Sequence, residues 1–178
     1  MEIKASCRYD IKALKAFRDI QLFGKGNPKT QKTIILVALY VVIAGLAFMT
    51  VMSDFDSNLL FMLVMMCVIG GLFTWSLFAS HKLMYKNSGN LAETVNNYVF
   101  TDTFFTVESE KEGYSGNSKI AYDTLYSIYE TSSYYFIYIN KVSSFIVDKS
   151  SINEEEIKMI SEKLKSSVRK RKYIRCKY

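Results

Sequence analysis

The chain has 178 residues, a net charge of +6 and 49% hydrophobic residues. Its three cysteines, Cys7, Cys67 and Cys176, lie far apart, and it has a single histidine. This composition excludes a disulfide framework and a Cys/His zinc centre. The positive charge is concentrated at the two ends of the chain, where residues 1–32 and 153–178 each have a net charge of about +5.

The first predicted element is a strand. Hydrophobic side chains occupy every second position of residues 3–9, as in a strand with one buried face: Ile3, Ala5, Cys7 and Tyr9. We expect this strand to complete a sheet formed by the later part of the chain.

An amphipathic helix follows, with Asp10 in position to cap its first turn. Its apolar face carries Ile11, Leu14, Phe17 and Leu22, and glycines end it near position 24. Its polar face carries Lys12, Lys15 and Arg18. Two interpretations stay open: an anchor on the membrane surface, or a helix packed on a cytoplasmic domain.

Two long apolar runs, residues 33–52 and 59–80, lack Lys, Arg, Asp and Glu. A helix of twenty residues is about 30 Å long, which is the thickness of the hydrocarbon core of a bilayer. Two buried helices of a soluble protein would keep a polar stripe and would need more surrounding chain than 178 residues provide. We therefore predict two transmembrane helices.

Charges around these runs set the predicted orientation. Lys25, Lys29 and Lys32 precede the first run, and Lys82 and Lys86 follow the second. The turn between them, residues 53–58, contains only acidic charges. Because Lys and Arg in short flanks stay in the cytoplasm, we expect both termini inside and the turn outside.

After a connector at residues 81–97, the pattern changes to short runs rich in β-branched and aromatic residues, separated by turn signals. We predict an antiparallel meander with strands at 98–101, 104–109, 118–122, 125–131, 134–140 and 144–148. Its tyrosines resemble the stacking platforms of nucleic-acid-binding proteins. The segment is net acidic, however, and half-buried strand positions favour Tyr, so no nucleic-acid partner is expected.

The last predicted element is a helix that closes the sheet. Asn153 and Glu156 have the spacing of a capping box, with a hydrophobic staple formed by Ile152 and Ile157. One narrow apolar stripe runs along it: Ile157, Ile160, Leu164 and Val168.

A basic tail follows the helix. We expect it to contact anionic headgroups of the cytoplasmic leaflet through Arg169, Lys170, Arg171, Lys172, Arg175 and Lys177. The alternative, a frayed and solvated terminus, stays open.

The sequence offers no catalytic, cofactor-binding or metal-binding set. His81 lies where the second span leaves the membrane, and about 20 Å of continuous helix would separate it from Cys67. Glu108 and Glu110 share a strand face but border a polar turn. The spans carry no buried acid or base of the kind that marks an ion pathway, so a transporter or channel is not expected.

The order of these parts, with Tyr122, the run "YETSSYYFIY" around Glu130 and Tyr135, and Lys149 before the capped helix, resembles the YcxB-like family of bacterial membrane proteins. Relatives commonly have a proline before that lysine, where this chain has Asp148. The resemblance implies a pleckstrin-homology-like domain, a bent antiparallel barrel closed by a helix.

The expected fold is therefore membrane α+β: a two-helix transmembrane hairpin and a cytoplasmic antiparallel β domain closed by a C-terminal helix. The expected location is the bacterial cell membrane, with the bilayer, its anionic headgroups and a protein or peptide as partners. Two functional classes stay open. One is a non-enzymatic interaction or regulatory module at the inner leaflet, and the other is a membrane-bound enzyme or small-ligand sensor.

Overall fold

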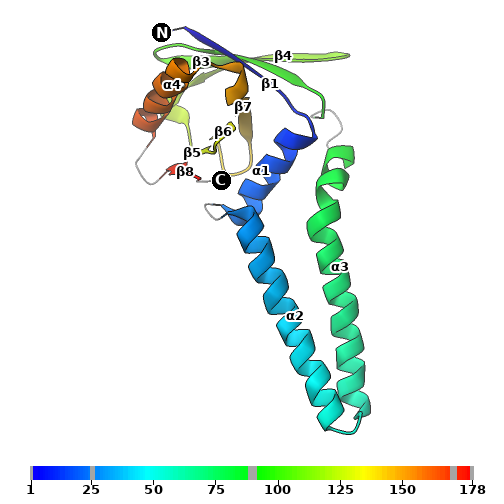
Figure 1. Ribbon diagram of the computed structural model, residues 1–178. Helices are drawn as coiled ribbons and strands as arrows, with labels where there is room; N and C mark the ends of the chain where they lie inside the picture. Colours follow the sequence, from blue (N-terminus) through cyan, green and yellow to red (C-terminus); the bar gives the residue numbers. More distant parts are fainter. Residues whose placement is uncertain (1, 25–26, 88–91, 169–171, 177–178) are drawn as a thin grey trace. The chain divides into compact units, whose positions relative to one another are not determined.

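The computed structural model describes residues 2–24, 27–87, 92–168 and 172–176, and it divides into two compact units (Figure 1). Unit 1 comprises Met1–Asn27 and Met84–Tyr178, and unit 2 is Pro28–Leu83. The helices are α1 (Ile11–Phe23), α2 (Pro28–Met52), α3 (Ser57–Asn87) and α4 (Glu154–Ser167), with short 3-10 helices η1 (Tyr122–Thr124) and η2 (Lys149–Ser151). The strands are β1 (Ile3–Arg8), β2 (Val95–Phe100), β3 (Phe104–Lys111), β4 (Tyr114–Ala121), β5 (Ser127–Glu130), β6 (Tyr134–Tyr138), β7 (Ser144–Asp148) and β8 (Tyr173–Arg175).

Unit 2 consists of α2 and most of α3, both long and apolar enough to cross a membrane. Only 6% of the most apolar window of each helix is buried, so neither helix is covered by protein as a soluble core helix would be. In the turn between them, Asp54 and Phe55 adopt left-handed φ angles of 50° and 62°. The Asp56 carboxylate then accepts a hydrogen bond from the Asn58 amide at 2.9 Å, which caps α3.

The first sheet of unit 1 is antiparallel, in the order β1-β2-β3-β4. β1 pairs with β2 from Ile3 opposite Phe100 to Arg8 opposite Val95. This pairing confirms that the start of the chain completes the sheet formed by its later part. The alternation along β1 is also as expected, because Ile3, Ala5 and Cys7 are buried and the residues between them are exposed.

β4 begins four residues earlier than the sequence indicated. Gly113, at a φ of 76°, closes a two-residue turn, so the pairing of β3 with β4 extends to Lys111 opposite Tyr114. The segment from Ser115 to Ser118 is polar and contains Gly and Asn, which are poor strand formers. It is therefore held in the sheet by its ladder with β3 and not by its own propensity.

The second sheet has the order β7-β6-β5-β8, and β8 is parallel to β5. The sequence did not indicate this strand: residues 173–175 of the basic tail belong to the sheet, so this part of the tail is not a frayed terminus. The Ile128 amide donates to the Lys172 carbonyl at 2.9 Å, and the Cys176 amide donates to the Glu130 carbonyl at 2.7 Å.

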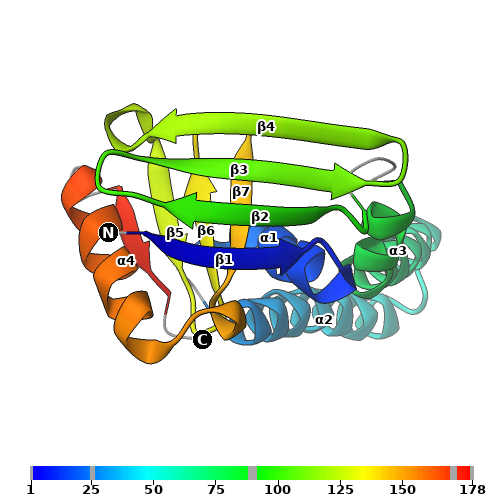
Figure 2. The same cartoon turned by 90° about the horizontal axis from the view of Figure 1, so that it is seen from above.

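The two sheets share one hydrophobic core (Figure 2). In that view their strands cross at a steep angle, and α4 lies beside the end of the first sheet at which β4 ends. Two tyrosines join the sheets: the Tyr98 hydroxyl donates to the Ile146 carbonyl at 2.8 Å, and the Ile146 amide donates to the Tyr9 hydroxyl at 3.0 Å.

Both helices of unit 1 that the sequence predicted have the expected caps. Asp10 accepts from the Ala13 amide at the start of α1, and Asn153 and Glu156 form the capping box of α4. α1 packs on the core through Ala13, Leu14 and Ile20, in agreement with the second interpretation of this helix, whereas Ile11 and Leu22 of the predicted apolar face are exposed. Most of the predicted stripe on α4 is also buried: Ile160 and Leu164 are fully inaccessible, Val168 is buried and Ile157 is partly buried.

Candidate functional site

The carboxylate of Glu130, at the end of β5, accepts four hydrogen bonds from described residues. One oxygen, Oε1, accepts from the Lys149 ammonium at 2.9 Å and from the Ser161 hydroxyl at 3.3 Å. The other, Oε2, accepts from the Tyr173 hydroxyl at 2.8 Å and from Arg175 Nε at 2.7 Å. One carboxylate therefore connects β5 with η2, α4 and β8. We call these five residues the Glu130 cluster.

The pair at the centre of the Glu130 cluster is buried. The side chains of Glu130 and Lys149 are only 8% and 10% exposed, whereas that of Arg175 is 66% exposed. Lys149 also donates to the Thr131 carbonyl at 2.7 Å, and its ammonium lies 4.4 Å from the centre of the Tyr135 ring. Each polar group of the buried pair thus has hydrogen-bond partners, which is the condition under which buried charges are tolerated.

This environment decides what Glu130 can do chemically. Burial alone raises the pKa of a carboxyl group, but the hydrogen bonds from Lys149, Arg175 and Tyr173 outweigh it and lower the pKa of Glu130 to about 2. A general acid or base works best with a pKa near the working pH. Glu130 is therefore suited to hold the fold together and not to transfer protons.

Other buried titratable groups are likewise unsuited to catalysis. Burial raises the pKa of the Cys7 thiol to about 12, and the pKa of the Tyr9 hydroxyl to about 12. Both groups stay protonated at neutral pH, so neither is an activated nucleophile or base. In unit 2, Cys67 and His81 both lie on helix α3, about 21 Å apart along its axis, which is too far for a Cys-His pair.

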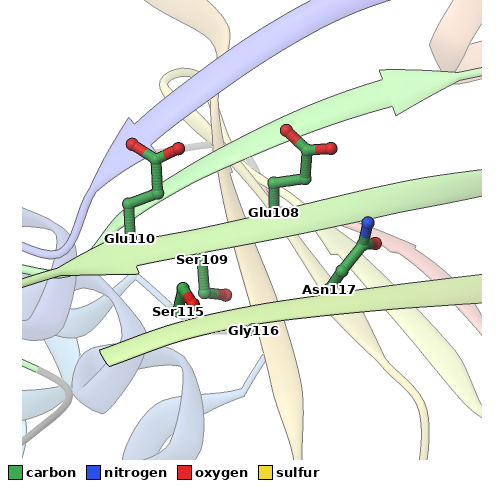
Figure 3. Close-up of a pocket in the computed structure, with 6 residues that line it drawn as sticks. All are labelled: Glu108, Ser109, Glu110, Ser115, Gly116 and Asn117. Carbon is green, nitrogen blue, oxygen red and sulfur yellow. The ribbon is translucent and has the colours of Figure 1, made fainter. Parts of the chain in front are cut away.

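The two glutamates singled out in the sequence lie together on the surface of the first sheet. Figure 3 shows Glu108 and Glu110 projecting from the same side of β3, beside Asn117 of β4. They border an open, polar cleft of about 240 Å³. Within the part of the chain that the structure describes, no group of three or more His, Cys, Asp or Glu residues is arranged to hold a metal ion.

A second cleft of unit 1, of about 390 Å³, combines aromatic rings with a lysine. It is lined by Ile20, Gln21, Gly24, Tyr126, Ser127, Tyr129, Tyr138 and Lys141. The Lys172 ammonium lies 4.4 Å from the centre of the Tyr126 ring, which is close enough for a cation–π contact.

The structure describes two of the six basic residues assigned to the membrane surface. Arg175 binds Glu130, and Lys172 lies on Tyr126. Arg169, Lys170, Arg171 and Lys177 lie outside the described residues. Contact of the six with anionic lipid stays a prediction.

Part of the Glu130 cluster was visible in the sequence, and part was missed. Glu130 and Lys149 were noted through the family resemblance, together with Tyr135, and the fold brings all three together. Ser161, Tyr173 and Arg175 were not connected with them. Glu130 is the only charged residue of the predicted strand 125–131, and this was the available signal.

Residues 100–164 match a family model described as YcxB-like protein. No curated protein and no solved structure matches the chain. The matched segment runs from the end of β2 into α4, so it includes Glu130, Tyr135 and Lys149. The match confirms the resemblance to the YcxB-like family over residues 100–164.

Proposed function

We propose that the chain is a multi-pass protein of the bacterial cell membrane, with α2 and α3 as its spans and both termini in the cytoplasm. Unit 1 then acts at the inner leaflet as a non-enzymatic interaction or regulatory module with a pleckstrin-homology-like fold. The observation that carries this proposal is the contrast between the units: unit 1 encloses its own core, whereas the apolar side chains of α2 and α3 are mostly exposed.

The exposed side chains of unit 2 support insertion into lipid. Phe48, Phe61, Leu72 and Trp75 are among many large apolar residues whose side chains are more than half exposed. Soluble proteins rarely expose continuous apolar surfaces of this kind. Each span also contains enough Leu, Ile, Val and Phe to make insertion favourable by several kcal/mol, at about −0.3 to −0.6 kcal/mol per central residue.

The chemistry of unit 1 supports a role in binding over a role in catalysis. Its buried ionic pair is fully hydrogen-bonded, and the pKa values of its buried Cys and Tyr side chains are shifted away from neutral pH. Glu108 and Glu110 lie exposed on the surface of β3, outside any enclosed pocket of the kind that usually holds catalytic groups.

One observation favours a second candidate, a small-ligand sensor. The cleft beside Tyr126 places three tyrosine side chains next to Lys141. Such a combination suits a small anionic ligand with an apolar part, because aromatic rings supply contact area and a lysine supplies charge.

Attachment to the inner leaflet is tested with the full-length protein in lipid nanodiscs. A fluorophore on Tyr178→Cys, in a Cys67→Ala background, reports the distance of the tail from nitroxide-labelled headgroups. We expect stronger quenching in discs with anionic phosphatidylglycerol than in neutral discs, because each basic residue near anionic lipid contributes about 1 kcal/mol. Added salt should weaken the quenching, since charges are screened beyond about 8 Å at physiological ionic strength.

The matched variant replaces Arg169, Lys170, Arg171, Lys172 and Lys177 by Gln and keeps Arg175, because Arg175 binds Glu130. This variant should lose the difference between anionic and neutral discs while retaining the fold of unit 1. Equal quenching of the unsubstituted protein in both kinds of disc would contradict attachment through the basic tail.

A further inference from the structure

β4 is an open edge of the first sheet. It pairs with β3 along its full length, from Phe104 opposite Ala121 to Lys111 opposite Tyr114, and no described strand pairs with its other side. The opposite edge of the sheet, β1, is covered. There, the Ser151 hydroxyl accepts a hydrogen bond from the Ser6 amide and donates one to the Ser6 carbonyl, both at 3.0 Å.

Proteins usually protect an edge strand with a proline, a bulge, a short length, charged side chains or a covering element. Lys119 is the one charged residue of β4. β4 has eight residues in a regular ladder, and it contains no proline. Its central side chains are small: Ser115, Gly116, Asn117 and Ser118. They leave the outer backbone groups of β4 accessible to a second strand, which is the requirement for recognition by strand addition.

The exposed face beside this edge has a defined charge pattern. Successive residues of a strand point to opposite faces, and residues paired across strands share a face. Glu110 is paired with Ser115, Glu108 with Asn117, and Thr106 with Lys119. On this face, Glu108 and Glu110 thus lie on the inner strand β3. Lys119 lies on the edge strand β4, two residues beyond Asn117 and four residues beyond Ser115.

We propose that β4 pairs antiparallel with β4 of a second copy of this chain, around a two-fold axis at Asn117. The two first sheets then become one continuous sheet. In this register Ser115 of one copy faces Lys119 of the other, and Ser115 is itself paired with Glu110. Lys119 of each copy therefore extends over the small Ser115 to Glu110 of the other copy, and the symmetry forms this contact twice.

Strand spacing permits the contact. The Lys119 and Glu110 backbones would be two strand spacings apart, about 10 Å. A lysine and a glutamate side chain together span roughly that distance. In the structure the Lys119 ammonium lies toward β3, 3.7 Å from the centre of the Phe104 ring, so the lysine side chain has to turn outward for this contact. Charge complementarity thus favours a second copy over an unrelated strand, because the same edge supplies both the lysine and the glutamate.

Confinement to a membrane strengthens this pairing. One pair of strands buries less surface than the roughly 1,200 Å² of a stable interface between free proteins. Two copies held in one bilayer meet at a higher effective concentration. In this respect the inference rests on the proposed function, and every assay below therefore also records whether the protein is in the membrane fraction.

The test is oxidative crosslinking of the full-length Asn117→Cys variant in native membranes, in a Cys67→Ala background. Residues facing each other across an antiparallel pair have Cα atoms about 4.5 to 5.5 Å apart, within the range of a disulfide. We expect a disulfide-linked dimer. Asn97→Cys is the matched control, because Asn97 lies on the same face of β2, in the same row as Glu108 and Asn117. Position 97 of one copy would lie five strand spacings, about 24 Å, from position 97 of the other, so the Asn97→Cys variant should stay monomeric.

Charge reversal tests the register. Lys119→Glu and Glu110→Lys should each lower the dimer yield of Asn117→Cys by roughly three- to tenfold, because each places like charges in one row. The combination of both reversals should restore the yield. Membrane-bound protein without the dimer, dimer without rescue by the double reversal, or an adduct with another protein in place of the dimer would each overturn self-pairing. Protein missing from the membrane fraction would instead overturn the proposed function.

Discussion

Glu130→Gln is expected to destabilise unit 1 by about 3–5 kcal/mol, because it leaves the buried Lys149 ammonium without a counter-charge. At roughly 4 °C per kcal/mol, the melting temperature of unit 1 should fall by more than 10 °C. The measurement is thermal unfolding of the detergent-solubilised full-length protein, in which the unfolding of unit 1 is monitored by its susceptibility to proteolysis at each temperature. A decrease of less than 1 kcal/mol would show that the Glu130 cluster does not stabilise the fold.

Two further variants localise the effect to the buried part of the cluster. Arg175→Gln removes the more exposed partner of the same carboxylate and should cost less than about 1 kcal/mol. Glu108→Gln changes an exposed glutamate of β3 and should shift stability by less than about 0.5 kcal/mol.

The effect of Glu130 should depend on pH in a defined direction. Its pKa in the folded protein is lowered to about 2, from 4.5 in the unfolded chain. A lowered pKa stabilises the fold above the unfolded value, and this stabilisation is lost as the pH falls through the folded value. The difference of about 2.5 pH units corresponds to roughly 3 kcal/mol. The difference in stability between the unsubstituted protein and Glu130→Gln should therefore shrink between pH 5 and pH 2.

Deletion of residues 2–9 is expected to abolish the protease resistance of residues 98–168. The deletion removes four buried side chains, those of Ile3, Ala5, Cys7 and Tyr9, and it exposes the edge of β2. Loss of a large buried side chain alone costs about 2–5 kcal/mol. The combined loss exceeds 5 kcal/mol and is comparable with the whole stability of a typical domain.

Limited trypsin digestion of the full-length protein in membranes measures this outcome. Lys4→Glu is the matched control, because it changes an exposed residue of β1 and keeps the strand. It should remain as resistant as the unsubstituted protein. A deletion variant that keeps the resistance of residues 98–168 would show that β1 is not part of the folding unit.

The elements that local patterns specify were predicted from the sequence. The two apolar runs, the alternation along β1 and the capping box of α4 each depend on residues close together in the chain. That β1 joins the later sheet was also predicted, although almost ninety residues separate it from its partner β2, because an alternating strand needs a sheet to cover its edge. Which strand it pairs with was not predicted.

The remaining features depend on contacts between distant residues. β8 has only three residues within a basic run, and its strand conformation comes from pairing with β5, more than forty positions away. The role of Glu130 is set by Lys149, Tyr173 and Arg175, and no local pattern connects these residues. β4 has a polar sequence typical of a loop, and its ladder with β3 overrides that propensity.

Cysteine accessibility in intact cells tests the central claim, a module held on the cytoplasmic side by two spans. In a Cys67→Ala background, Ser57→Cys lies at the start of α3 beside the acidic turn, and Val142→Cys lies on a surface loop of unit 1, where Val142 is 78% exposed. A membrane-impermeant maleimide should label Ser57→Cys from outside the cell, and it should label Val142→Cys only after the membrane is permeabilised. Labelling of Val142→Cys in intact cells, with Ser57→Cys protected, would contradict the account.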